Sequence, residues 1–157
     1  MLKKNGYLIL MIAVVAGLII ASLNKENIYE LISSEVQKST TAKEKFNAQK
    51  YIYDHFDYES NKQDFDYSIL EFKSAGCTIC KQMEPELEKI KTWNEERVNV
   101  VVIQIMNPDS QEMMKFYGIS AVPTHIILDK KGNEFFRKYG FISAEDMRMK
   151  ILTNQTN

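Results

Sequence analysis

The sequence predicts an α/β fold in which a central β-sheet is flanked by helices and preceded by one N-terminal transmembrane helix. Two observations carry this prediction. Residues 7–23 form an uncharged apolar run, and from about residue 55 strand-like and helix-like segments alternate. Helices that lie between buried strands imply a sheet covered on both faces. At 157 residues, the chain can hold one domain of ordinary size with appendages.

The N-terminal segment is long enough to span a membrane. Residues 7–23 carry no charge, and Gly6 extends the run to eighteen residues, within the roughly 17–25 that a transmembrane helix needs. Lys3 and Lys4 precede the run, which favours a cytoplasmic N-terminus and places the rest of the chain outside the cytoplasm. A cleaved signal peptide and a buried soluble helix are the alternatives. We therefore expect a transmembrane anchor (or signal peptide) over residues 1–23.

A polar segment follows the apolar run. Residues 24–54 are rich in Lys, Glu, Ser, Thr and Asn, with one weak amphipathic stretch. The apolar residues of that stretch fall on one helical face: Ile28, Leu31, Ile32 and Val36. The simplest interpretation is a polar stalk that holds a folded domain, residues 55–157, away from the membrane, with a helix that packs on it. A dimerisation or partner helix is the alternative.

The elements after residue 55 follow the order β-α-β-α-β-β-α. Strands are expected at Tyr67–Lys73, Val98–Met106, Thr124–Asp129 and Glu134–Tyr139. Helices are expected at Thr78–Asn94, between Asn107-Pro108 and Gly118, and after Ser143. The near-continuous apolar run of the second strand is typical of a strand buried on both faces. Lys130-Lys131-Gly132-Asn133 predicts a hairpin, and Ser143 with Asp146 resembles a capping box.

Charge and cysteine content exclude several function classes. The net charge of −1 gives no electrostatic case for nucleic-acid binding. Cys77 and Cys80 are too few for a disulfide framework. A zinc site needs about four ligands, and the chain offers only these two cysteines with His55 and His125. Redox chemistry needs nothing more than the cysteine pair, so no cofactor is expected.

The two cysteines stand where a strand gives way to a helix. Cys77 is expected at or just before the first helical turn, where free backbone N–H groups and the helix dipole favour an anion. This position lowers the pKa of its thiol below the ~8.5 of a free cysteine and populates the thiolate that attacks disulfides. Cys80 lies on the same helical face, and we expect it to be more buried and to act second. Half of a metal site remains an alternative.

The residues around the cysteines resemble the thioredoxin family. Cys77-Thr78-Ile79-Cys80-Lys81-Gln82-Met83-Glu84-Pro85 is similar to the family's C-x-x-C-K-x-x-x-P motif. Glu71 matches the buried acid at the end of the family's central strand, and Val122-Pro123-Thr124 resembles its cis-proline segment. Tyr139-Gly140-Phe141 resembles the glycine before the last helix. The resemblance covers roughly residues 55–153.

The resemblance implies a thioredoxin-like fold with a central mixed β-sheet. It also implies a membrane-anchored, extracytoplasmic thiol–disulfide oxidoreductase with Cys77 as nucleophile and Cys80 as resolving thiol. Glu71, its pKa raised by burial, would take the proton of the resolving thiol. Val122-Pro123-Thr124 would receive the substrate backbone. The implied partners are protein thiols and disulfides and a membrane protein that donates or accepts electrons.

Several of these residues have simpler interpretations on their own. Glu71 alone would be an edge-exposed strand residue, Pro123 a turn proline, and His125 a strand residue without a role. Gly76 stands where the family usually has tryptophan, and Thr78-Ile79 replaces Gly-Pro between the cysteines. Since that dipeptide is a main control on redox poise, the direction of electron flow stays open.

Two other functions compete with exchange. One is a thioredoxin-like module that binds a metal such as copper, or apoprotein thiols, without redox turnover. The other is a disulfide that only stabilises the fold, although closing so small a loop stabilises little.

Overall fold

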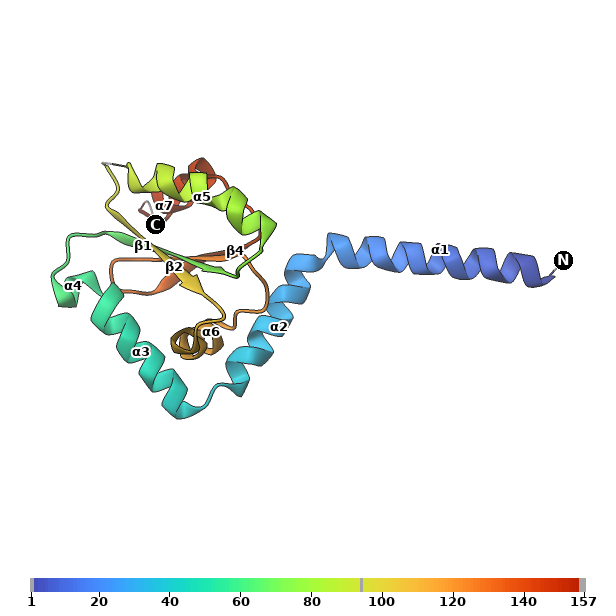
Figure 1. Cartoon of the computed structure of the whole chain (residues 1–157), viewed down its shortest axis with the longest axis horizontal. Coiled ribbons are helices and arrows are strands. Elements are labelled where there is room, and N and C mark those ends of the chain that lie inside the picture. The colour runs from blue at the N-terminus through green and yellow to red at the C-terminus, as the bar shows by residue number, and fades with distance from the viewer. Residues whose placement is uncertain (1, 94, 156–157) are drawn as a thin grey trace.

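The computed structural model describes residues 2–93 and 95–155, and Figure 1 shows a layered domain from which one long helix projects. The helices of the first third are α1 (Leu2–Leu23), α2 (Lys25–Ser39), α3 (Ala42–Phe56) and α4 (Tyr58–Asn61). The remainder comprises β1 (Tyr67–Lys73), α5 (Thr78–Lys91), β2 (Val98–Gln104), the 3-10 turn η1 (Pro108–Ser110), α6 (Gln111–Tyr117), β3 (Thr124–Leu128), β4 (Glu134–Tyr139) and α7 (Ala144–Gln155).

The four strands form one mixed sheet in the order β2-β1-β3-β4. β1 pairs with β2 in parallel, whereas β3 is antiparallel to both β1 and β4. The mixed sheet and the strand–helix order confirm the predicted fold class. The expectation that the second strand is buried on both faces is wrong, because β2 is an edge strand and Val102 is 44% exposed.

Helices cover both faces of the sheet. In Figure 1, α5 and α7 lie above the sheet, and α3 and α6 lie below it. Successive strand residues point to opposite faces. On β1, Ile69 therefore packs in the core under α5 and α7, while Leu70 and Phe72 pack in the core with α3 and α6.

Local signals set most element ends as predicted. Asn107 caps η1 with Pro108 at its first position, and Gly118 ends α6 in the left-handed conformation at φ 63°. The Ser143 hydroxyl accepts a hydrogen bond from the Asp146 N–H at 3.1 Å, where α7 begins. The helix expected to reach Asn94 ends earlier, at Lys91, and Asn94 itself lies outside the described residues.

The apolar N-terminal segment is a single exposed helix. By length and composition, Gly6–Leu23 could cross a membrane, and no part of it is buried against the domain in the region that the structure describes. A soluble core helix would be buried, so the geometry disagrees with that alternative.

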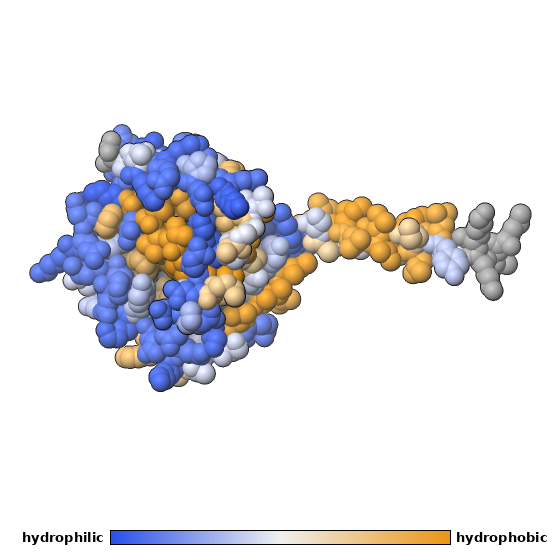
Figure 2. Space-filling view, in the orientation of Figure 1, coloured by the Kyte–Doolittle hydropathy of each residue, from blue (hydrophilic) through white to orange (hydrophobic). Residues whose placement is uncertain are grey.

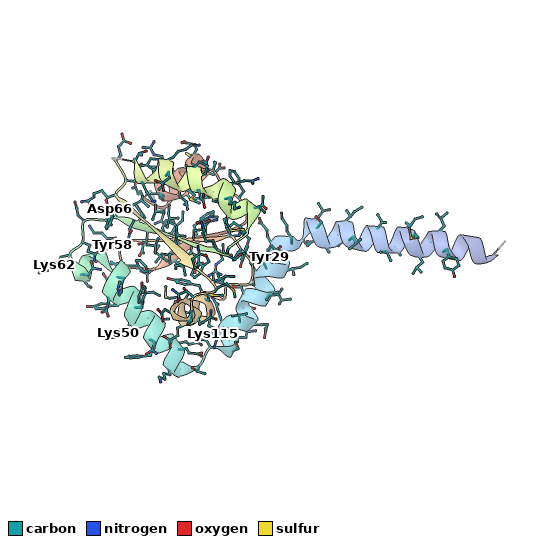
Figure 3. The ribbon with its side chains drawn as sticks, viewed as in Figure 1. Tyr29, Lys50, Tyr58, Lys62, Asp66 and Lys115 are labelled. Carbon is teal, nitrogen blue, oxygen red and sulfur yellow. A yellow bond between two sulfur atoms is a disulfide. The ribbon has the colours of Figure 1, made fainter. Side chains whose placement is uncertain are left out.

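Most of residues 24–54 lie in α2 and α3, and both helices contact the domain, as the expectation of a packed helix in this segment anticipated. Ala48 and Ile52 of α3 belong to the core beneath the sheet. α2 packs through small polar residues: the hydroxyls of Ser33 and Thr40 donate to the carbonyls of Tyr117 (3.4 Å) and Lys115 (3.1 Å). Figure 3 shows Lys115 on α6, between α2 and α3. These contacts involve few large apolar side chains, so hydrophobic periodicity does not reveal them.

Candidate active site

The loop after β1 delivers Cys77 to the start of α5. Gly76 has φ 81°, a left-handed conformation that suits glycine, and this turn directs the chain into the helix. Cys77 is the N-cap residue, and its sulfur accepts a hydrogen bond from the Cys80 N–H at 3.1 Å. The sulfur therefore lies at the positive end of the helix dipole, as the sequence predicted.

The two cysteines form a disulfide with unequal exposure. Cys77 and Cys80 are bonded to each other across the first turn of α5. Cys77 is partly exposed, whereas Cys80 is only 1% exposed. An incoming sulfur can therefore reach Cys77 and not Cys80.

The segment of Pro123 lies at the same edge of the sheet. The peptide bond between Val122 and Pro123 is cis. Phe72 is the register partner of Thr124, so the chain enters β3 at the edge where β1 leaves for the cysteine loop. The carbonyl of Pro123 accepts a hydrogen bond from the Gly140 N–H at 2.8 Å, which ties the segment to the end of β4.

Glu71 is fully buried on the side of the sheet that faces α5. It shares this face with Ile69, two residues earlier, and its own side chain is 0% exposed. Neither carboxyl oxygen has a hydrogen-bond partner among the described residues. Burial raises the pKa of this carboxyl from 4.5 to about 7, while the nearby Lys73 charge lowers it by a smaller amount. The group can thus bind or release a proton near neutral pH.

His125 lies opposite Glu71, a neighbour that sequence reasoning missed. The two residues are register partners on β3 and β1, and Nε2 lies 3.9 Å from Oε1, beyond hydrogen-bond distance. His125 is 0% exposed, and both ring nitrogens lack partners within the described part of the chain. Burial lowers the pKa of its imidazole to about 4, so the ring is neutral at pH 7. Only the strand register reveals this pair.

The cysteine pair is not part of a larger ligand cluster. Over residues 2–93 and 95–155, no group of three or more His, Cys, Asp or Glu side chains is arranged to hold a metal ion. His55 lies on α3 and stacks on Tyr51, with ring centroids 4.0 Å apart. His125 is enclosed in the core beside Glu71.

Sequence comparisons identify relatives of the domain. The family model for the thioredoxin-like domain matches residues 57–154. The chloroplastic thioredoxin-like protein HCF164 is 28% identical in Oryza sativa subsp. japonica and 27% identical in Arabidopsis thaliana. Each match extends over 67 residues, 43% of this chain and 26% of the relative. The match thus spans about a quarter of the length of these proteins.

Solved structures share the fold. Chloroplastic thioredoxin z has a TM-score of 0.52 and 25% identity, over 64% of this chain and 87% of that chain. Thioredoxin-2 of the malaria parasite has a TM-score of 0.51 and 21% identity, over 58% of this chain and 85% of that chain. The family model covers more than half of the chain and includes both cysteines. The chain therefore belongs to the thioredoxin-like family.

Proposed function

We propose that this protein is a membrane-tethered thiol–disulfide oxidoreductase that acts on protein substrates outside the cytoplasm. The observation that carries the proposal is the Cys77–Cys80 disulfide at the N-terminus of α5, with one sulfur accessible and the other buried. Family membership supports the same chemistry. Reaction at an exposed helix N-terminus followed by internal resolution is what this geometry favours.

In the reducing direction, the reaction proceeds in two exchanges. The Cys77 thiolate attacks one sulfur of a substrate disulfide, forming a mixed disulfide and releasing the other substrate sulfur as a thiolate. The Cys80 thiolate then attacks the sulfur of Cys77 and releases the second substrate sulfur. Two electrons pass to the substrate, which leaves as a dithiol after protonation, and the Cys77–Cys80 disulfide remains. The oxidising direction is the reverse sequence.

Glu71 is proposed as the proton acceptor for the second exchange. A thiol must lose its proton before it attacks, and Cys80 is shielded from bulk water. Glu71 is buried on the face of the sheet that α5 covers, and its pKa of about 7 allows it to take a proton near neutrality. Val122-Pro123-Thr124 is proposed to hold the substrate backbone at the adjoining edge of the sheet.

The proposed location rests on the N-terminal helix. Gly6–Leu23 is an exposed apolar helix, consistent with a single-pass membrane anchor. Lys3 and Lys4 precede it, which favours a cytoplasmic N-terminus and a domain on the opposite side. A membrane protein that donates or accepts electrons is the proposed redox partner.

Trapping of mixed disulfides tests the proposal. The full-length Cys80→Ser variant is expected to accumulate disulfide-linked adducts with substrate proteins, because the resolving sulfur is absent. These adducts should disappear on reduction and should not form in the Cys77→Ser, Cys80→Ser double variant. Absence of adducts, together with no exchange between the reduced wild-type protein and a small soluble disulfide, would contradict the proposed function.

A further inference from the structure

The apolar helix α1 and the following helix α2 meet at a single residue, Asn24. The Asn24 N–H donates to the carbonyl of Ile20, and the Ile28 N–H donates to the carbonyl of Asn24, both at 3.1 Å. The first bond closes the last turn of α1 and the second opens α2, and Asn24, with φ −103° and ψ 16°, is the N-cap residue between them. A single residue thus separates the apolar span from α2, which keeps the start of α2 close to the end of the span.

The first turns of α2 are fixed to the rim of the redox site. Ser120, three residues before Pro123, donates a hydrogen bond from its hydroxyl to the carbonyl of Tyr29 at 3.2 Å. The rings of Tyr29 and Tyr139 lie 5.2 Å apart, and Tyr139 precedes the glycine that binds the Pro123 carbonyl. Glu26 forms an ion pair with Lys138 of β4. Figure 3 shows Tyr29 where α2 meets the domain, on the side from which α1 leaves.

Further along the helix, a partly buried arginine secures α2. Arg137 of β4 donates to the Ser33 hydroxyl at 3.0 Å and to the Tyr117 carbonyl at 2.6 Å. Gly118 lies against Ser33 so closely that a Cβ atom there would fall within 3.0 Å of it. Contacts along the whole helix thus hold α2 in one position on the domain.

The outer face of α2 is apolar and open. Ile28, Leu31 and Ile32 are 40%, 64% and 45% exposed, although they form the apolar stripe of an amphipathic helix. In Figure 2, the hydrophobic surface of α1 continues along the outer side of α2. An apolar surface of this kind marks contact with a membrane or another protein. The continuity of this apolar face with the anchor favours the lipid interface over another protein.

We propose that α2 is an interfacial helix that holds the redox site at a fixed, short height above the bilayer. Tyr29 follows the end of the apolar span by six residues, which corresponds to about 9 Å at the helical rise per residue, interrupted at Asn24. The cis-proline loop that contacts Tyr29 is thus close to the lipid headgroups. In Figure 1, the first turn of α5 also lies on the side of α1. The site then reacts with thiols and disulfides of proteins presented at the membrane surface; this inference rests on the proposed function.

The depth of α2 tests the lipid contact independently of redox activity. Full-length Leu31→Trp protein in phosphatidylcholine vesicles with brominated acyl chains should lose fluorescence relative to unbrominated vesicles. The matched control is Tyr53→Trp, an exposed position on α3, and Trp93 contributes equally to both variants. Equal quenching of the two variants would overturn the proposal. Emission of Leu31→Trp that changes with protein density, without bromolipid quenching, would assign the face to a second copy and also overturn it.

The height of the site is tested with two lipid-linked probes. Vesicles carry a pyridyl disulfide either directly on the phosphatidylethanolamine headgroup or on a long polyethylene glycol spacer, and release of pyridine-2-thione gives the rate. The reduced wild-type protein should favour the headgroup probe. A variant with a 20-residue Gly-Ser insertion after Asn24 and Gln at positions 28, 31 and 32 should lose this preference by about threefold or more, because a long tether dilutes the site over many heights.

The controls separate placement from chemistry. Phe46→Gln with Tyr53→Gln removes exposed ring surface from α3 instead and should leave the preference unchanged. All variants should react with a soluble disulfide at the wild-type rate. If the variant with the Gly-Ser insertion keeps the preference for the headgroup probe, the inference about the height of the site is overturned, but the proposed thiol–disulfide exchange is not. Failure of every form to react with the soluble disulfide would contradict the proposed function instead, and the quenching experiment would still decide the placement of α2.

Discussion

Substitution of Glu71 by glutamine should change how the stability of the fold depends on pH. Burial raises the pKa of Glu71 from 4.5 to about 7, so folding opposes ionisation of this carboxyl. The carboxyl binds its proton more tightly in the folded state than in the unfolded state. At 1.36 kcal/mol per pKa unit, the difference between 4.5 and about 7 corresponds to about 3 kcal/mol of folding free energy. The wild-type protein should lose this stability as the pH rises from 4.5 through 7. Glutamine has a similar size and cannot ionise, so the variant should not show that loss.

Urea unfolding of the oxidised full-length protein in detergent micelles measures this effect. Trp93, the single tryptophan, reports the transition. The stability difference between Glu71→Gln and wild type should grow in favour of the variant by about 3 kcal/mol between pH 4.5 and pH 8. Parallel stability curves for the two proteins would refute the argument.

Glu88→Gln is the matched control for that experiment. Glu88 is a carboxylate on α5, the helix that covers Glu71, but its side chain is exposed and forms a surface ion pair with Lys91 at 2.6 Å. Exposed pairs of this kind contribute about 0–1 kcal/mol. The control should therefore follow the wild-type pH dependence, which would assign the effect to the buried carboxyl.

Three further predictions follow from the same geometry. Burial lowers the pKa of His125 from 6.5 to about 4, so the free energy of unfolding of the wild-type protein should fall by about 3 kcal/mol as the pH falls from 6.5 through 4. His125→Leu should not show this fall when urea unfolding is measured at both pH values. Gly118→Ala should lower the free energy of unfolding by about 2–4 kcal/mol, because residue 118 has a left-handed conformation and the new Cβ would clash with Ser33. Gly140→Ala should lower it by only about 1 kcal/mol in the same assay, because no described atom lies within 4 Å of the new Cβ. In rapid-mixing experiments, release of the second substrate thiol should accelerate as the pH rises through about 7, and Glu71→Gln should make this step slower and flatter with pH.

Local sequence signals predict the elements of the sheet domain because their causes are local. The apolar runs, the polar cap before Pro108 and the glycine after α6 act within one or two turns of the chain. The position of the cysteines follows for the same reason, since the N-terminus of α5 is set by its own cap. The expected burial of β2 was wrong because its place at the sheet edge depends on strand order, which a single strand does not encode.

The arrangement of α2 could not be predicted because an amphipathic helix usually packs its apolar face against the domain, and α2 packs its polar face there. Its apolar stripe, Ile28, Leu31 and Ile32, faces outwards, and its polar Ser33 faces the domain. Close approach to Gly118 and hydrogen bonds from Arg137 replace apolar packing at this interface. A helix that docks through its polar side leaves its apolar side available, which is what a helix beside a bilayer requires.

The register between β1 and β3, which places His125 beside Glu71, bears on the proton transfer that we propose for Glu71. A charged imidazole beside Glu71 would lower the pKa of the carboxyl and hold it ionised far below neutrality. Burial prevents this, because it keeps His125 neutral at every pH well above about 4. Glu71 therefore remains close to half-protonated near pH 7, the condition under which one group both accepts and returns a proton efficiently. Both carboxyl oxygens of Glu71 and both ring nitrogens of His125 lack hydrogen-bond partners within the described residues, which destabilises the fold, and the proton-acceptor role that we propose for Glu71 would explain why such a pair is buried here.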